Sequence, residues 1–142
     1  MSSRLLGRRG DGGFSTVEVV LLAPIFILLL LLIVVLGRMQ QAGADVTGAA
    51  RDGARAASLA RSAPEATTAA RQAVTDALAG QALVCQGGPS TAVDTSSFSP
   101  GGQVRVAVSC VVPLSDIGFS ALPGSRAMTR QAISPVETFR AP

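Results

Sequence analysis

The chain of 142 residues contains no histidine, no lysine, no tryptophan and no tyrosine. Without His or Lys, its Ser and Thr hydroxyls lack the bases that usually activate a nucleophile. The missing histidines also remove the commonest zinc ligand, and Cys85 and Cys110 stand far apart with no further ligand beside them. We therefore expect no enzyme, no metal site and no cofactor.

Large apolar residues are scarce outside one segment. The chain has five Phe in all, and most of its long aliphatic side chains fall between Val19 and Leu36. The sequence after this segment is rich in Ala, Gly, Ser and Thr, which is little material for a large core. This length and composition leave room for one membrane helix and one small domain.

All twelve basic residues are arginines, and the formal net charge is +3. Proteins that bind nucleic acids cluster their positive charge and often place aromatic residues among it. Here the arginines are scattered, and acids stand close to many of them, as in Arg51-Asp52. We expect no nucleic-acid partner.

The apolar run, Val19 to Leu36, carries no charge and has one helix breaker, Pro24. As a helix it would be about 27 Å long, close to the thickness of the hydrocarbon core of a lipid bilayer. Glu18 directly precedes it. A carboxylate costs roughly 2.5–3.5 kcal/mol at mid-bilayer and less at the interface, so Glu18 calls for a cationic partner.

Three interpretations of the N-terminal segment compete. A cleaved secretory signal would have a shorter apolar region and a small-residue site after it, which Leu36-Gly37-Arg38 does not offer. A plain uncleaved anchor explains the length and charge but leaves Gly12-Gly13 and Glu18 unexplained. A cut between Gly13 and Phe14 uses all these features, because the new amino group of Phe14 could pair with Glu18 of a neighbouring copy.

The hexapeptide from Gly13 to Glu18 resembles the type IV prepilin processing site: a glycine before the cut, an aromatic first residue and a glutamate at the fifth mature position. From Arg9 to Leu59 the chain is similar to the TadE-like family of minor pilins (pseudopilins) of tight-adherence pilus systems. The similarity is carried by Arg9-Gly10, Thr16-Val17-Glu18, Ala23-Pro24, Gly37-Arg38 and residues 49–57. Val19 departs from the family, which often has an aromatic residue after the glutamate.

The resemblance implies cleavage by a prepilin peptidase after Gly13 and a role in assembling or priming a pilus. The implied partners are that peptidase, other pilins or pseudopilins of the system, pilus assembly membrane proteins and the lipid bilayer. The alternative is an uncleaved, membrane-anchored extracytoplasmic binding module. In that protein Gly13 would be part of a flexible link and Glu18 an acid tolerated at a helix N-terminus.

The charge distribution predicts the orientation. Arg4, Arg8 and Arg9 outweigh Asp11 before the apolar run, whereas charges after it are sparser. The positive-inside rule then places the N-terminus in the cytoplasm, with a single pass through the cytoplasmic membrane and an extracytoplasmic C-terminal domain. We predict a leader at 1–13, a transmembrane helix at 14–37, its extramembrane continuation at 38–62 and a small domain at 63–142.

Helical features continue beyond the membrane. Ala49, Gly53 and Ala57 recur every four residues, and small residues at this spacing let helices approach closely. They would pack either on neighbouring pilin helices or another membrane protein, or on the chain's own C-terminal domain. Ser62 and Glu65 form a capping-box pattern with Pro64 between them, which predicts a second helix reaching about Leu78 and ending at Gly80.

After Gly80 the period changes to two. Val104, Val106, Val108 and Cys110 alternate with smaller or polar residues, which predicts a strand. We expect further strands at Leu83-Val84-Cys85 and at 127–134, with a loop at 86–102. The expected fold is α+β: a long helix, a second helix and a three-stranded antiparallel sheet against the second helix. Cys85 and Cys110 would form a disulfide in an exported domain, the alternative being two unpaired thiols.

Overall fold

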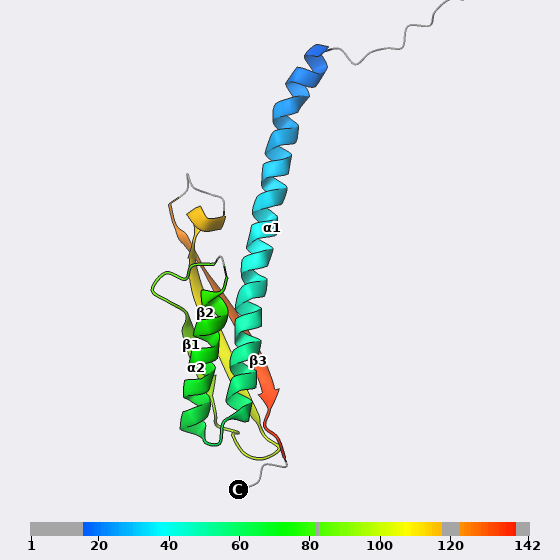
Figure 1. Cartoon of the computed structure of the whole chain (residues 1–142). Helices are drawn as coiled ribbons and strands as arrows, with labels where there is room; N and C mark the ends of the chain where they lie inside the picture. The colour runs from blue at the N-terminus through cyan, green and yellow to red at the C-terminus, as the bar shows by residue number, and fades with distance from the viewer. Residues whose placement is uncertain (1–15, 82, 118–122, 139–142) are drawn as a thin grey trace, which may run out of the picture. The chain divides into compact units, whose positions relative to one another are not determined.

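The computed structural model describes residues 16–81, 83–117 and 123–138 and divides the chain into two compact units, Met1–Val34 and Val35–Pro142. We call the second unit the domain. Helix α1 (Thr16–Leu59) begins in the first unit and ends in the domain. The other elements all belong to the domain: α2 (Ala63–Ala79), β1 (Ser90–Asp94), β2 (Gln103–Pro113), the 3-10 helix η1 (Leu114–Ile117) and β3 (Ser125–Pro135) (Figure 1). The predicted α+β order of a long apolar helix, a second helix and a three-stranded antiparallel sheet is confirmed.

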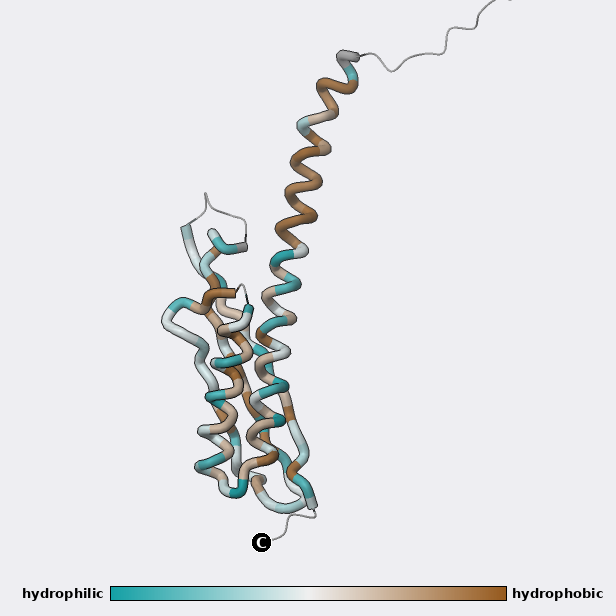
Figure 2. The backbone as a smooth tube through the Cα atoms, viewed as in Figure 1, coloured by the Kyte–Doolittle hydropathy of each residue, from teal (hydrophilic) through white to brown (hydrophobic). Residues whose placement is uncertain are grey.

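Helix α1 changes character along its length (Figure 2). Its N-terminal half carries the apolar run, whereas from Gly37 onward polar residues alternate with Ala and Gly. Beyond Gly37 one face of the helix is buried and forms a stripe: Ala42, Gly43, Val46, Ala49, Ala50, Gly53, Ala54, Ala57 and Ser58. This amphipathic pattern of small residues makes residues 42–59 a core helix of the domain.

The start of α2 follows the predicted capping pattern with one difference. The Ser62 side chain accepts a hydrogen bond from the Glu65 N–H at 3.4 Å, and Pro64 lies in the first turn. The Glu65 carboxylate, however, accepts from the N–H of Arg61 at 2.8 Å rather than from that of Ser62. Both bonds satisfy donors at the turn between α1 and α2, and Gly80 ends the helix as predicted.

Strand β2 is the centre of the sheet. It pairs antiparallel with β1 on one side and with β3 on the other. Its inward side chains are buried, as the alternation predicted: Val104, Val106, Val108, Cys110 and Val112. They pack on a second buried stripe from α2, which is Ala66, Ala70, Val74 and Leu78, and on the stripe of α1. The sheet therefore covers both helices and not α2 alone.

The first strand was predicted at Leu83-Val84-Cys85, and this is wrong. Residues 83–85 have no strand structure, and β1 lies at Ser90–Asp94, inside the predicted loop. Its short alternating sequence becomes a strand by pairing with β2, where Thr91 meets Val108 and Val93 meets Val106. The third strand has the predicted place but is longer than 127–134.

A local hydrogen bond ends β1. The Ser96 N–H donates to Oδ1 of Asp94 at 3.0 Å, in the manner of an Asx turn. This backbone bond is the main cause that holds the pKa of Asp94 below its ordinary value. The Ser96 hydroxyl also lowers the pKa, desolvation opposes both bonds, and the charge of Arg105 across the strand pair lowers it least. The turn thus uses the ionised carboxylate and is weakened when acid protonates it.

Helix α1 packs tightly against its neighbours at Gly53. A Cβ atom added there would lie 2.8 Å from Cγ2 of Val74 and 3.3 Å from both the Ala70 carbonyl oxygen and Cγ1 of Val106. These atoms belong to α2 and β2, and Val74 and Val106 are fully buried. Only glycine fits between the three elements without displacing one of them.

Gly53→Ala should therefore destabilise the domain by about 1–3 kcal/mol, because overpacking outweighs the helix-propensity gain of up to ~1 kcal/mol. Thermal unfolding of the full chain in detergent, followed by circular dichroism, measures this. Gly48→Ala is the matched control, since nothing lies within 4 Å of its added Cβ, and it should be neutral or stabilising. A Gly53→Ala protein as stable as Gly48→Ala would show that the close approach is not required.

Candidate functional site

The apolar run of α1 is exposed on every face. Its large side chains from Val19 to Val34 have exposed fractions between 37% and 67%. A helix that is apolar all round is typical of a membrane span or a large core, and none of the described residues covers this one. Among the described residues α1 is the one helix long and apolar enough to cross a membrane.

Glu18 lies in the first turn of α1, directly before the apolar run, and its side chain is exposed. The first basic residue of α1 is Arg38, twenty positions further on, or about 30 Å along a helix. Helix α1 therefore supplies no cation to Glu18. The helix dipole favours an anion at this end by only ~0.3–1 kcal/mol. Gly13 and Phe14, the predicted processing site, lie outside the described residues.

The small-residue stripe of Ala49, Gly53 and Ala57 is turned toward the chain's own core. Ala49 and Ala57 are buried, and Gly53 lies against Val74 and Val106 as described above. In this structure the stripe thus packs on α2 and β2, the second of the two alternatives weighed from the sequence.

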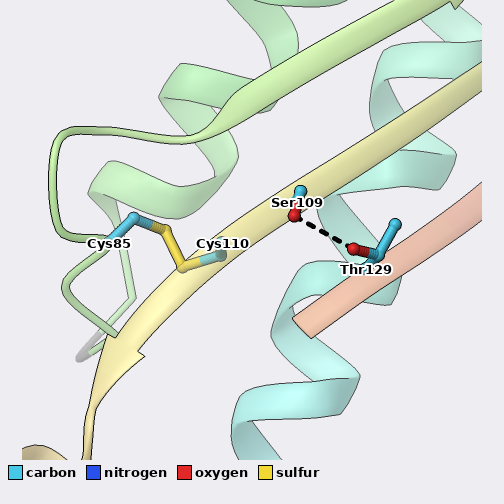
Figure 3. Close-up of a disulfide and its surroundings, with 4 residues drawn as sticks. All are labelled: Cys85, Ser109, Cys110 and Thr129. Atoms are coloured by element: carbon cyan, nitrogen blue, oxygen red, sulfur yellow. Dashed lines mark hydrogen bonds between the residues drawn. A yellow bond between two sulfur atoms is a disulfide. The ribbon is translucent and has the colours of Figure 1, made fainter. Parts of the chain in front are cut away.

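Cys85 and Cys110 form a disulfide, with their Cα atoms 5.1 Å apart (Figure 3). Cys110 is buried on β2, whereas Cys85 lies in the irregular segment after α2. The Gln86 N–H donates to the Val111 carbonyl at 2.8 Å, directly beside the disulfide. The short strand predicted at residues 83–85 does not form. The disulfide and this hydrogen bond instead connect the segment after α2 to the central strand of the sheet.

The described residues contain no group of three or more His, Cys, Asp or Glu arranged to hold a metal ion. Several open hollows lie on the described surface of the domain. One of them, of about 300 Å³, lies between the start of the domain part of α1 and β3. Leu36, Met39 and Gln40 line it from α1, and Arg126 and Arg130 line it from β3.

Sequence reasoning did not find this hollow. In the register of the sheet Arg126 pairs with Val112 and Arg130 with Val108, so both arginines occupy positions on the face of β3 that turns toward the helices. Met128 between them is buried, while both arginines are exposed. Because Arg126, Met128 and Arg130 alternate along the sequence, they could have been predicted to share one face of a strand. The sequence did not indicate that α1 would lie against this face.

Comparison with known proteins gives one positive finding. Residues 13–55 match the model of a family described as TadE-like protein. This confirms the resemblance over a segment that contains nearly all of α1. No curated protein and no solved structure matches the chain.

Loss of the disulfide should lower the stability of the domain. Opening a loop with a sequence separation of 25 costs about 3–4 kcal/mol in the chain-entropy model. Dithiothreitol should therefore lower the thermal midpoint of the full chain in detergent, and it should leave the midpoint of a Cys85→Ala/Cys110→Ala variant unchanged. An equal shift in both proteins, or none in either, would contradict a stabilising disulfide.

Proposed function

We propose that this chain, TadE-like over residues 13–55, is a minor pilin-like membrane protein of a tight-adherence pilus system. A prepilin peptidase would cut it after Gly13, and the mature chain, beginning at Phe14, would act in assembling or priming the pilus. The domain would lie outside the cytoplasm, and the protein itself is no enzyme. The observation that carries the proposal is the family match, which begins at residue 13 and includes both Glu18 and the apolar run.

Membrane anchoring is supported by the exposure of α1. Each apolar side chain left in water costs roughly 25 cal/mol per Å² of its exposed surface, so a run of eighteen residues that are exposed except for the half-buried Val35 strongly favours a lipid environment. Pro24 removes one hydrogen bond from the helix. Transmembrane helices tolerate such a residue, because neighbouring helices and local adjustments can satisfy the freed carbonyl group.

The proposed role of Glu18 follows from its isolation. Helix α1 offers it no cation, and a carboxylate in an apolar setting needs a charged partner in good geometry. The α-amino group created at Phe14 by the cut is such a cation. Supplied by a neighbouring subunit, it would join two copies, or this chain and another pilin, at the level where Glu18 enters the membrane.

Processing is tested by N-terminal sequencing and intact mass of the membrane-extracted protein from cells that express the peptidase. The wild-type chain should begin at Phe14, whereas Gly13→Leu should keep its leader. Gly10→Leu, a glycine replacement in the same leader, should still be cut. A wild-type chain that begins at Met1 or Ser2 would instead indicate the uncleaved, anchored binding module.

The role of Glu18 is tested by replacing it. Glu18→Gln keeps the shape of the side chain but removes its charge, so pilus assembly should fall at least tenfold while the cut after Gly13 continues. Asp52→Asn removes an exposed carboxylate from the domain part of α1 and is the matched control. Assembly is measured by shearing pili from cells and quantifying the major subunit. Full assembly with Glu18→Gln would exclude the pairing.

A further inference from the structure

The hollow between α1 and β3 combines two chemistries. Leu36 and Met39 give it an apolar wall, while Arg126, Arg130 and Gln40 give it a polar one. Leu36 is also the last residue of the apolar run. If the apolar run spans the bilayer, its last residue lies where the hydrocarbon ends. Because Leu36 also lines the hollow, the hollow lies next to that boundary.

The height of the arginines above the hydrocarbon is fixed by α1. A Cβ atom added at Gly43 would lie 3.3 Å from Nη2 of Arg130, so this guanidinium rests on α1 seven residues after Leu36. Seven residues of helix rise about 10 Å. Arg126 lies in the same hollow as Leu36 and Met39, which begin this stretch. The headgroup layer of a bilayer occupies roughly 5–8 Å on each side, so Arg130 lies near its outer edge, while Arg126 shares the hollow with Leu36 and Met39 nearer the hydrocarbon.

The positive charge in the hollow has no counterpart there. Its lining residues include two arginines and no carboxylate. Arg130 donates from Nη1 to the carbonyl oxygen of its neighbour Thr129 at 2.9 Å, which leaves its other N–H groups available. Among the described residues neither Arg126 nor Arg130 forms an ion pair. Arginine presents several donors in a fixed fork that matches the oxygens of a phosphate group.

We propose that this hollow binds the headgroup phosphate of an anionic phospholipid in the leaflet from which α1 emerges. Arg126 contacts the phosphate, Arg130 adds its positive charge at the outer edge of the headgroup layer, and the acyl chain follows Met39 and Leu36 down into the bilayer. The proposal rests on the membrane anchoring of α1 proposed above. It adds a lipid preference that a simple anchor does not require.

The lack of tryptophan and tyrosine makes a clean measurement possible. Leu36→Trp places a unique fluorophore at the wall of the hollow. The full-length protein is reconstituted into vesicles of equal amounts of phosphatidylglycerol and phosphatidylcholine, with bromine on the acyl chains of one lipid or of the other. Bromine quenches indole fluorescence on contact, so the two samples compare how often each lipid touches position 36. Both leaflets have the same composition, so the direction of insertion does not matter.

Brominated phosphatidylglycerol should quench at least about twofold more strongly than brominated phosphatidylcholine. In the same background, Arg126→Gln/Arg130→Gln should make the two lipids equal. The matched control is Arg51→Gln/Arg71→Gln, which removes two exposed arginines elsewhere in the domain and should keep the preference. Arg126→Lys/Arg130→Lys retains the charge and should keep most of it.

The outcomes separate this site from the anchoring itself. No quenching by either lipid would overturn membrane insertion and the headgroup site together. Equal quenching by both lipids, or a preference that survives Arg126→Gln/Arg130→Gln, would overturn the headgroup site alone. Should the glutamine variant fail to fold, salt replaces it: 1 M NaCl screens the attraction and should abolish the preference of the Leu36→Trp protein. A preference unchanged by salt would contradict the proposal.

Discussion

The domain depends on the close approach of α1, α2 and β2 at Gly53. Its largest fully buried side chains are six valines and Cys110, and the rest of its core is mostly alanine. Alanine and valine side chains reach only a short distance, so the elements must lie close together for them to touch. A methyl group at Gly53 would separate three elements at once and loosen contacts along both buried helix stripes.

The small side chains of the domain core and the long side chains of the apolar run are two consequences of one uneven composition. More than half of the leucines and isoleucines of the chain lie in the apolar run, where their side chains are exposed and none belongs to the buried core of the domain. Small domains with too little apolar material often rely on a covalent link. The disulfide serves this purpose after α2, because Cys85 lies in an irregular segment whose described residues form one backbone hydrogen bond to β2, from Gln86 to Val111.

The sequence predicted those features whose signals are local. A short stretch of sequence was enough to predict three of them: the charge-free run, the cap at Ser62 and the alternation of β2. The disulfide was predicted from composition, because the chain has only two cysteines. It failed at β1, because Ser90–Asp94 has no strong strand pattern and owes its structure to pairing with β2. The hollow was beyond sequence reasoning for a similar reason, since Leu36 and Arg126 are 90 positions apart and only the fold brings them together.

The two ends of the apolar run carry opposite charges, and these call for different partners. At its start Glu18 has no cation of α1 near it, since Arg38 lies about 30 Å further along the helix, and the proposed partner is a protein amine. At its end the proposed partner of Arg126 and Arg130 is a lipid phosphate. A subunit that leaves the bilayer for a filament can keep the first partner, because it belongs to another subunit, but must release the second. Anionic lipid would then favour the membrane-bound state, and pairing at Glu18 would favour the assembled one.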